Sequence, residues 1–432
     1  MKMANMDDYF DVVIVGTGAA GLYCALNLPA RYRILLLTKQ KADESDSFLA
    51  QGGICMQHGE ADYRPFFDDT MRAGHYENNP ATVDLMIRSS NSIIRDLVRR
   101  GVRFARDDHG ALRFTREGAH SRPRILFHED ITGHEITQTL LNEVLRCENI
   151  ELREYTTLLD FFADASACGG VIAAGPDGEP RAIGAGSVVL ACGGIGGLYK
   201  NSTNFPHITG DAIAMALRHG VACEHMDYIQ IHPTTLYSHR KGRRFLISES
   251  VRGEGALLLD KNGNRFTNEL QPRDVVSAAI RAQMEKDSTD HVWEDMRPIG
   301  EAAIREHFPN ILERCEEEGY DPIHEPIPVV PAQHYFMGGI TADLSSRTAL
   351  PRLYACGETC CNGVHGRNRL ASNSLLESLV FAQRAADDIL YGEPPVFTGD
   401  KPDLAPYREQ EPLFAAYRQE VLTAIERSKN HE

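Results

Sequence analysis

The sequence lacks any long apolar segment. No hydrophobic run approaches the ~20 residues that a membrane-spanning helix requires, and the first residues contain no apolar core of a signal peptide. We therefore expect a cytoplasmic protein that does not bind membranes. The chain also lacks an excess of positive charge, because 45 Lys and Arg stand against 61 Asp and Glu, a formal net charge of −16. This balance argues against nucleic acid and anionic lipid as partners.

Cysteine pairs at metal-binding spacing are absent as well. The ten cysteines are scattered, and none forms a Cys-x-x-Cys pair. We interpret them as reduced and mostly buried thiols, and we predict no metal site. The adjacent Cys360 and Cys361 could be redox-active, but packing or chance explains them more simply.

The most informative feature that is present lies near the N-terminus. The continuous apolar run of residues 12–15 is typical of a parallel strand buried on both faces. Gly16, Gly18 and Gly21 follow it in the pattern G-x-G-x-x-G. In a strand–turn–helix context, these glycines permit a tight turn, a close approach to a pyrophosphate, and close packing of the helix. The pattern predicts a dinucleotide site, and the alternative is an ordinary glycine-rich turn.

The second expected strand, near residues 33–37, bears on which dinucleotide binds. An acidic residue often follows such a strand and takes the ribose hydroxyls, but Thr38 and Lys39 stand there instead. The next segment favours FAD, because Ser45 and Ser47 lead into residues 50–53, Ala-Gln-Gly-Gly. Two adjacent glycines after a polar loop suit a backbone that lies against a flavin ring. A later strand ending in Gly357-Glu358 could bring a carboxylate to the same cofactor.

The rest of the chain predicts an α/β fold: a Rossmann-like FAD-binding domain with an inserted α+β capping domain. Apolar spacing predicts helices over about 80–100 and 133–147, and short strands over 150–190 end at Gly193-Gly194. We expect a helix after Gly210, with Asp211 as its cap. The segment from about 227 is rich in His, Arg and Pro, and cofactor-like sequence returns at 336. The expected divisions are 1–226 and 336–400 for the FAD-binding domain, 227–335 for the cap, and 401–432 for a helical tail.

The expected cap and its edges contain residues suited to binding a small anion. They are His232, Ser248, Arg252, Arg273, His334 and Arg369, and Glu249 lies among them in the sequence. Each has a simpler alternative: Arg252 could pair with Glu254, His232 could close a turn, and Arg273 could be solvated. Together they suggest a clamp for a dicarboxylate, since Arg binds carboxylate bidentately and His adds a donor without permanent charge.

These motifs resemble the succinate dehydrogenase/fumarate reductase flavoprotein superfamily and, within it, the L-aspartate oxidase family. The motifs that carry the resemblance are Gln51-Gly-Gly, His232-Pro-Thr, Arg252-Gly-Glu-Gly, Pro272-Arg-Asp and Asn373-Ser-Leu-Leu-Glu. The similarity runs from about residue 8 to residue 391. It implies a flavoenzyme of de novo NAD synthesis that converts aspartate to iminoaspartate by hydride transfer to flavin N5.

Two features distinguish members of the superfamily. Some attach FAD covalently through a histidine just before the Ala-x-Gly-Gly turn, but this chain has Asp46 near that place and no histidine between Lys39 and Gln57. Noncovalent FAD is therefore expected. The run from Thr115 to Gly118 resembles an aspartate oxidase signature whose Glu117 would lie near the substrate amine. The alternative for Glu117 is an ion pair with a neighbouring arginine on a loop.

The resemblance implies a role for each site residue. His232, Ser248, His334 and Arg369 would hold the two carboxylates with support from Arg252, Glu117 would orient the amine, and Arg273 would move protons with Glu249 as a relay. The expected contacts to FAD are Gly16, Gly18, Ala19, Ala20, Gly21, Thr38, Lys39, Ser45, Ser47, Ala50, Gln51, Gly52, Gly53, Thr157, Leu158, Gly193, Asp211, Glu358, Asn373, Ser374 and Leu375.

The resemblance also implies partners and alternatives. O₂ or fumarate would reoxidise the flavin, and quinolinate synthase is a further expected partner. A soluble fumarate reductase is the nearest alternative, and an inert flavin-binding subunit is another. The chain departs from the family in two ways: Ser248 stands where Thr is expected, and only about 40 residues follow position 391, where a C-terminal helical domain of roughly a hundred residues is usual.

Overall fold

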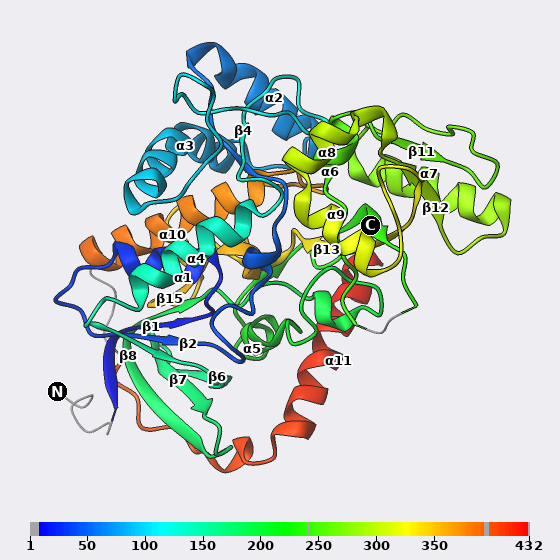
Figure 1. Cartoon of the computed structure of the whole chain (residues 1–432). Coiled ribbons are helices and arrows are strands. Elements are labelled where there is room, and N and C mark those ends of the chain that lie inside the picture. The colour runs from blue at the N-terminus through cyan, green and yellow to red at the C-terminus, as the bar shows by residue number, and fades with distance from the viewer. Residues whose placement is uncertain (1–7, 240–241, 393–396, 431–432) are drawn as a thin grey trace.

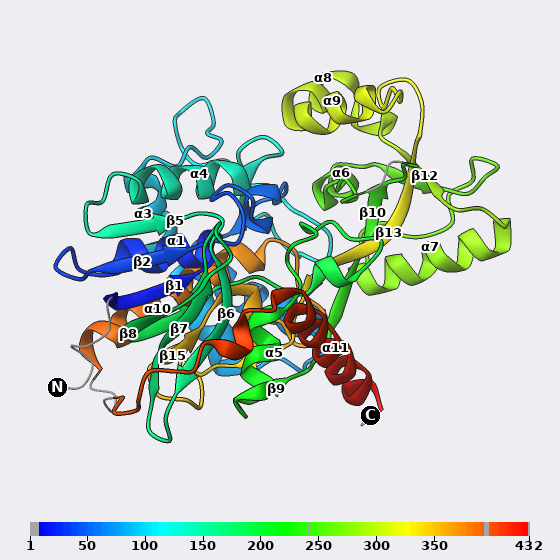
Figure 2. The same ribbon diagram turned by 90° about the horizontal axis from the view of Figure 1, so that it is seen from below.

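The computed structural model describes residues 8–239, 242–392 and 397–430. A seven-stranded sheet forms its centre (Figures 1 and 2). Its strands are β1 (Tyr9–Val15), β2 (Ile34–Leu37), β5 (Ile150–Arg153), β6 (Thr157–Ala163), β7 (Cys168–Ala174), β8 (Pro180–Leu190) and β15 (Leu353–Ala355). The spatial order is β5-β2-β1-β8-β7-β6, with β15 also paired to β8. The pairs β5–β2, β2–β1, β1–β8 and β8–β15 are parallel, whereas β6 and β7 pair antiparallel.

Helices cover both faces of this sheet. The helices of the main body are α1 (Ala19–Asn27), α2 (Tyr63–Ala73), α3 (Pro80–Arg100), α4 (Thr132–Val144), α5 (Asp211–Arg218), α10 (Asn373–Tyr391) and α11 (Gln410–Lys429). Val12 and Ile14 of β1 pack with residues of α1, α3, α4 and α10, whereas Val13 and Val15 pack with α5 and α11. Because side chains alternate along a strand, burial on both faces explains the continuous apolar run of β1.

A second, smaller unit carries a four-stranded antiparallel sheet in the order β10-β13-β12-β11. Its elements are β10 (Ile229–Leu236), α6 (Glu249–Gly253), β11 (Leu257–Leu259), α7 (Arg273–Asp287), β12 (Val292–Asp295), α8 (Glu301–His307), α9 (Pro309–Glu317) and β13 (Ile327–Phe336). Figure 2 shows it projecting from one side of the main body. The predicted α/β fold with an FAD-binding core is confirmed, while the exact domain boundaries stay a prediction.

Short elements complete the chain. Two small sheets contain β3 (Ile54–Cys55) with β4 (Ile125–Leu126), and β16 (Cys360–Cys361), β14 (Gly339–Thr341) and β9 (Cys223–Glu224). The 3-10 helices are η2 (Asp46–Leu49), η3 (Glu60–Asp62), η4 (Gly196–Leu198), η5 (Arg297–Ile299), η6 (Gly357–Thr359) and η7 (Ala405–Tyr407). None of the helices within the described ranges combines the length and apolar character needed to cross a bilayer.

The N-termini of α3 and α5 can be compared with the helix starts that the sequence predicts. The helix predicted over 80–100 is α3, which begins after Asn79, whose side chain accepts a hydrogen bond from Ala81 N at 3.0 Å. The expected capping role of Asp211 is wrong. Gly210 occupies the cap position of α5, and Asp211 is the first helical residue. Its carboxylate accepts hydrogen bonds from Lys39 Nζ and Thr209 Oγ1, each at 2.7 Å, so it is used in a tertiary contact.

The tail helix α11 packs through the predicted apolar stripe. Tyr417, Val421 and Ile425 are buried against the α5 side of the central sheet. The Tyr417 hydroxyl also donates to the backbone oxygen of Leu159 at 2.6 Å. The helix therefore finds its packing surface within this chain.

Candidate active site

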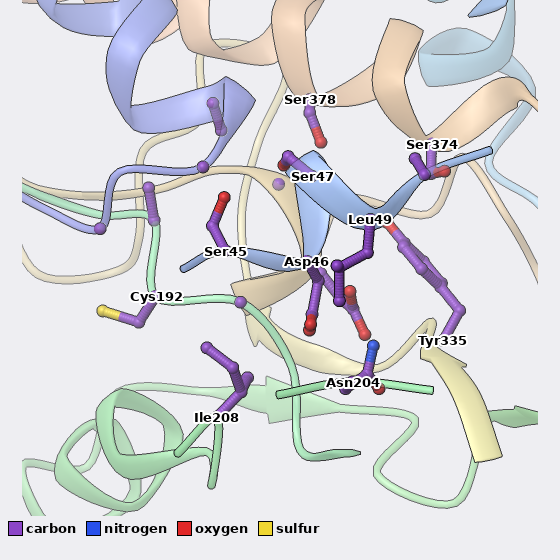
Figure 3. A pocket seen from close by; sticks show the side chains of 18 of the residues that line it. Ser45, Asp46, Ser47, Leu49, Cys192, Asn204, Ile208, Tyr335, Ser374 and Ser378 are labelled. Atoms are coloured by element: carbon purple, nitrogen blue, oxygen red, sulfur yellow. The ribbon is translucent and has the colours of Figure 1, made fainter. Parts of the chain in front are cut away.

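One large cavity connects the main body to the smaller unit (Figure 3). It encloses about 1690 Å³ of space between atoms, including the open solvent at its mouth. Its lining begins at the carboxyl ends of β1 and β2, which is where open parallel sheets bind ligands. Residues of β10, α6, α7 and β13 line it as well. The cavity thus has a cofactor half, built on the main body, and a substrate half, built largely on the smaller unit.

The glycine turn forms one wall of the cofactor half. Gly16 has a φ of +114°, and a Cβ there would lie 2.0 Å from the Ala191 backbone oxygen. A Cβ on Gly21 would lie 1.9 Å from the Gly16 oxygen, so side chains are excluded at both positions. At the start of α1, the backbone N–H of Ala19 donates to Ser47 Oγ at 3.0 Å. The turn therefore presents backbone and a helix N-terminus to the cavity.

A carboxylate from a distant element lies near the end of β2. Thr38 and Lys39 line the cavity as predicted, and Lys39 Nζ lies 2.7 Å from Asp211 Oδ2. This brings a carboxylate from α5 to the end of β2, although no acid follows β2 in the sequence.

The chemistry of the cofactor half fits FAD. Buried Ser45 Oγ and Gln51 Oε1 have no hydrogen-bond partner among the described residues, and both residues line the cavity. Backbone at the Gly16–Gly18 turn and the N-terminus of α1 suit a pyrophosphate. A polar group that is buried without a partner is costly, so these oxygens are suited to bonding a ligand.

The substrate half is centred on two buried guanidinium groups. Arg273 Nε donates to Glu249 Oε2 at 2.5 Å, and its Nη1 donates to Gln230 Oε1 at 2.8 Å. Arg369 Nε donates to the same amide oxygen at 3.3 Å, and its Nη1 donates to Ser374 Oγ at 2.5 Å. Burial and the charge of Arg273 lower the pKa of Arg369 to about 10, so it stays charged at neutral pH. The predicted alternative of a solvated Arg273 is wrong.

Two imidazole rings face this pair of arginines. The rings of His232 and His334 lie 5.1 Å apart, edge to face. His334 Nδ1 lies 2.7 Å from Thr203 Oγ1, while His232 Nε2 is buried and has no partner among the described residues. Burial and the charge of Arg273 hold the pKa of both histidines well below the ordinary value. They are therefore neutral, and each can offer one N–H to an anion.

Glu117 lies inside the cavity and is not paired on a loop. It is 3% exposed, accepts from Ser250 Oγ at 3.0 Å, and accepts from Ser372 Oγ at 2.6 Å. Burial and the nearby charge of Glu249 raise the pKa of Glu117. Burial acts on Glu249 too, but the charges of Arg273 and its neighbour Arg252 outweigh it and lower the pKa of Glu249. A cation entering the cavity would stabilise the ionised form of Glu117.

Most residues predicted for the site line this cavity. Those that line it are Gly16, Gly18, Ala20, Thr38, Lys39, Ser45, Ser47, Ala50, Gln51, Gly52, Gly53, Glu117, Thr157, Leu158, Gly193, Asp211, His232, Ser248, Glu249, Arg273, His334, Glu358, Arg369, Ser374 and Leu375. Ala19, Gly21, Arg252 and Asn373 are absent from the lining. Asn373 instead donates to Thr70 Oγ1 at 3.1 Å.

Arg252 supports the wall from outside. Its Nη1 donates to the Glu269 backbone oxygen at 2.8 Å, and its Nη2 lies 3.7 Å from Glu249 Oε2. The considered pair with Glu254 is wrong, because Glu254 Oε2 lies 2.7 Å from His307 Nδ1 instead.

Sequence reasoning missed several residues that shape the site. They are Thr203, Asn204, Gln230, Tyr335, Ser372 and Ser378. Gln230 carries a signal that could have found it, since it lies two residues before His232 on the same strand. Thr203 and Ser372 act only through tertiary contacts, to His334 and Glu117, and no local pattern marks them.

Comparisons with known proteins agree with this geometry. A family model described as an FAD binding domain matches residues 11–375. L-aspartate oxidase of Clostridium perfringens is 48% identical over 380 residues, which cover 88% of this chain and 86% of that protein. The chain belongs to the L-aspartate oxidase family. L-aspartate oxidase of Nostoc is 44% identical over 442 residues, which cover 98% of this chain and 76% of the Nostoc protein.

The fold of this chain is also similar to that of a solved flavoprotein structure. E. coli quinol fumarate reductase FrdA superposes with a TM-score of 0.83 at 30% identity, covering 95% of this chain and 74% of that one. The chain is thus an FAD-binding flavoprotein of the fold that the sequence analysis expected.

The adjacent pair Cys360 and Cys361 and one cluster of possible metal ligands lie outside the cavity lining. Cys360 and Cys361 are buried free thiols, and burial raises the pKa of Cys361 to about 12, which makes it unreactive at neutral pH. Glu224, His225 and Cys361 have ligand atoms within 4.8 Å of one another, and none of the three lines the cavity. The absence of a metal site stays a prediction.

Proposed function

We propose that this chain oxidises L-aspartate to iminoaspartate, with noncovalently bound FAD and with O₂ or fumarate as the electron acceptor. The observation that carries the proposal is the convergence of Glu117, two arginines and two neutral histidines on one FAD-suited cavity. A C4 dicarboxylate needs the cationic and N–H donors, and only an amino dicarboxylate needs the additional buried carboxylate. When bound, the flavin supplies the acceptor for the hydride that leaves the substrate Cα.

The chain's own residues would bind and orient the substrate. Arg369, His334 and Ser248 would donate hydrogen bonds to the carboxylates. His232 Nδ1 lies 2.9 Å from Thr234 O and 3.2 Å from Thr234 N, and His232 would donate through Nε2 in the tautomer in which Nδ1 accepts from Thr234 N. Glu117 would hold the amine and thereby turn the Cα–H bond toward the acceptor. Fixed donors of this kind require little reorganisation during the reaction.

Arg273 and Glu249 would govern charge at the reacting carbon. Arginine is very hard to deprotonate, and a neutral amine can expel hydride with its own lone pair. During aspartate oxidation, Arg273 would therefore act chiefly by electrostatic positioning. The reduction of fumarate is a different reaction, in which one carbon receives a hydride and the other must be protonated. The Arg273–Glu249 contact offers a route for that proton.

A soluble fumarate reductase is the second candidate, favoured by the resemblance of the fold to E. coli FrdA. The arginine and histidine groups of the cavity suit any C4 dicarboxylate, including fumarate. Glu117 distinguishes the two, because fumarate has no amine for it to bind. An inert flavin-binding subunit would have no reason to keep Glu117, Arg273 and His334 in one cavity.

Further parts of the proposal concern the cellular setting. The imine product would pass to quinolinate synthase in the first step of de novo NAD synthesis, and the protein would be cytoplasmic. The segments 1–226 with 336–400, and 227–335, would form the FAD-binding and capping domains, followed by a tail over 401–432.

The direct test is anaerobic mixing of the purified yellow protein with L-aspartate. We expect aspartate to bleach the flavin absorbance, whereas succinate, which lacks the amine, should do so far more slowly. Protein that fails to bleach with aspartate but reduces fumarate when prereduced would support the fumarate reductase instead. Acid precipitation of the same sample should release all of the colour, since no histidine precedes the Gln51-Gly-Gly turn; flavin retained by the pellet would show a covalent link.

A further inference from the structure

Asp46 is an acidic residue in the cofactor half that the proposed reaction does not use. It is the first residue of η2, in the loop that leads to Gly52, and it lines the cavity (Figure 3). A carboxyl group at this position can bring a negative charge to the cofactor.

The carboxyl is held in place but incompletely satisfied. Oδ1 accepts a hydrogen bond from Phe205 N at 2.9 Å. Oδ2 is shielded from solvent and has no partner among the residues that the structure describes. The amide of Asn204 faces the carboxyl from below in Figure 3. One oxygen is therefore fixed by backbone, and the Asn204 side chain also stabilises the ionised carboxyl.

Two charged groups from other parts of the chain affect the ionisation of Asp46. Arg243, in the connection between β10 and α6, stabilises its charge, and Glu358 of η6 opposes it. Burial raises the pKa of Asp46 to about 7, in spite of Arg243 and the Phe205 N–H. Burial and the charge of Asp46 raise the pKa of Glu358 to about 8.

We propose that the Asp46 carboxyl lowers the reduction potential of the bound FAD and makes that potential depend on pH. A carboxylate disfavours the addition of electrons to a neighbouring group, and the effect is strong in a cavity with little water to screen it. The proposal rests on FAD binding in this cavity and not on the identity of the substrate.

Proton linkage fixes the direction of the pH effect. Electrons added beside a carboxyl raise its pKa, so Asp46 takes up protons when the cofactor is reduced. The potential should then fall more steeply with rising pH near neutrality than it would without Asp46. At about pH 5, roughly two units below its pKa, the carboxyl is protonated in both states and its effect disappears.

The test is a redox titration of the holoenzyme in the absence of substrate. The flavin absorbance reports the reduction potential, which is measured at several pH values from 5 to 9. Asp46→Asn removes the charge and keeps the shape. At pH 8.5 we expect it to shift the equilibrium toward reduced flavin by about tenfold, which equals about 30 mV for two electrons. At pH 5 the variant and the wild type should coincide.

Matched variants make the result specific. Asp43→Asn removes the same charge from an exposed position three residues away and should follow the wild type at every pH. Asp46→Ser provides a second uncharged variant if Asn impairs FAD binding, and it should behave as Asn does. Curves that coincide at every pH, or an offset that is equal at pH 5 and pH 8.5, would overturn the proposal. Loss of FAD from both variants would overturn it too, because Asp46 would then be structural.

Because no substrate is present, this result does not depend on whether aspartate is oxidised. A protein whose flavin is not bleached by aspartate can still show the change in reduction potential in Asp46→Asn. Conversely, a protein that oxidises aspartate can lack that change, so the two proposals can fail separately.

Discussion

The two halves of the cavity are built from different parts of the chain. The cofactor half uses backbone, glycines and hydroxyls, most of them from the continuous segment 15–53. The substrate half uses charged and aromatic side chains that come from segments as distant as Glu117 and Arg369. In the first half, substitution fails because an added atom has no room. In the second, it fails because a buried charge or hydrogen bond loses its partner.

The contrast predicts that the two halves can be damaged separately. A change in the glycine turn should remove the cofactor and with it every activity. A change among the arginines, the histidines or Glu117 should leave the protein yellow and alter only what it does with substrate.

The largest expected effect is loss of FAD from Gly21→Ala. The new Cβ would lie 1.9 Å from the Gly16 backbone oxygen, so helix α1 must move away from the turn that it supports. We expect colourless protein after purification, measured as the flavin-to-protein absorbance ratio. Gly175→Ala is the matched control, because its Cβ would have no atom within 3.6 Å, the closest being Arg181 Nη1 at 3.7 Å. Normal FAD content in Gly21→Ala would refute the argument from close packing.

Arg273→Lys should have the next largest effect, on turnover. Lysine keeps the charge but cannot make the two directed contacts to Glu249 and Gln230. If Arg273 takes part in proton transfer, fumarate reduction should fall by roughly 10²–10⁴-fold. Inhibition by succinate, measured with the same variant, should change far less. Equal losses in binding and turnover would reduce Arg273 to a binding residue.

Arg369→Ala and His334→Ala should weaken dicarboxylate binding. Loss of one partner of a desolvated charge pair costs roughly 2–5 kcal/mol, so KM for aspartate should rise by tens-fold or more. FAD content should stay near normal in both variants. Arg367→Ala, two residues away with a partly exposed side chain, serves as the control. Unchanged KM in both test variants would exclude them from the clamp.

Sequence reasoning succeeded where structure is local. Residues 12–15 and the three glycines predict strand, turn and helix because each element is specified within a few residues. It failed where distant contacts decide. Asp211 looked like a helix cap, but Lys39, 172 residues earlier in the chain, takes its carboxylate. Gln230, which is shared by both arginines, was missed because its role exists only once Arg273 and Arg369 have been brought beside it.

Arg252 shows the same limit within a single helix. The neighbouring Glu254 suggested a structural ion pair, but the short helix α6 turns the guanidinium inward to Glu249 and the Glu269 backbone. Local spacing therefore identified the residue types of the substrate half but could not give their partners.

The decisive measurement compares two activities of Glu117→Gln with those of the wild type. Aspartate carries an amine that the Glu117 carboxylate would hold, whereas fumarate presents no amine to the same cavity. We expect kcat/KM for aspartate oxidation to fall by at least about tenfold, equivalent to ~1.4 kcal/mol, while fumarate reduction by chemically reduced enzyme stays nearly intact. A parallel loss of both activities would show that Glu117 is structural and would contradict the assignment of substrate made here.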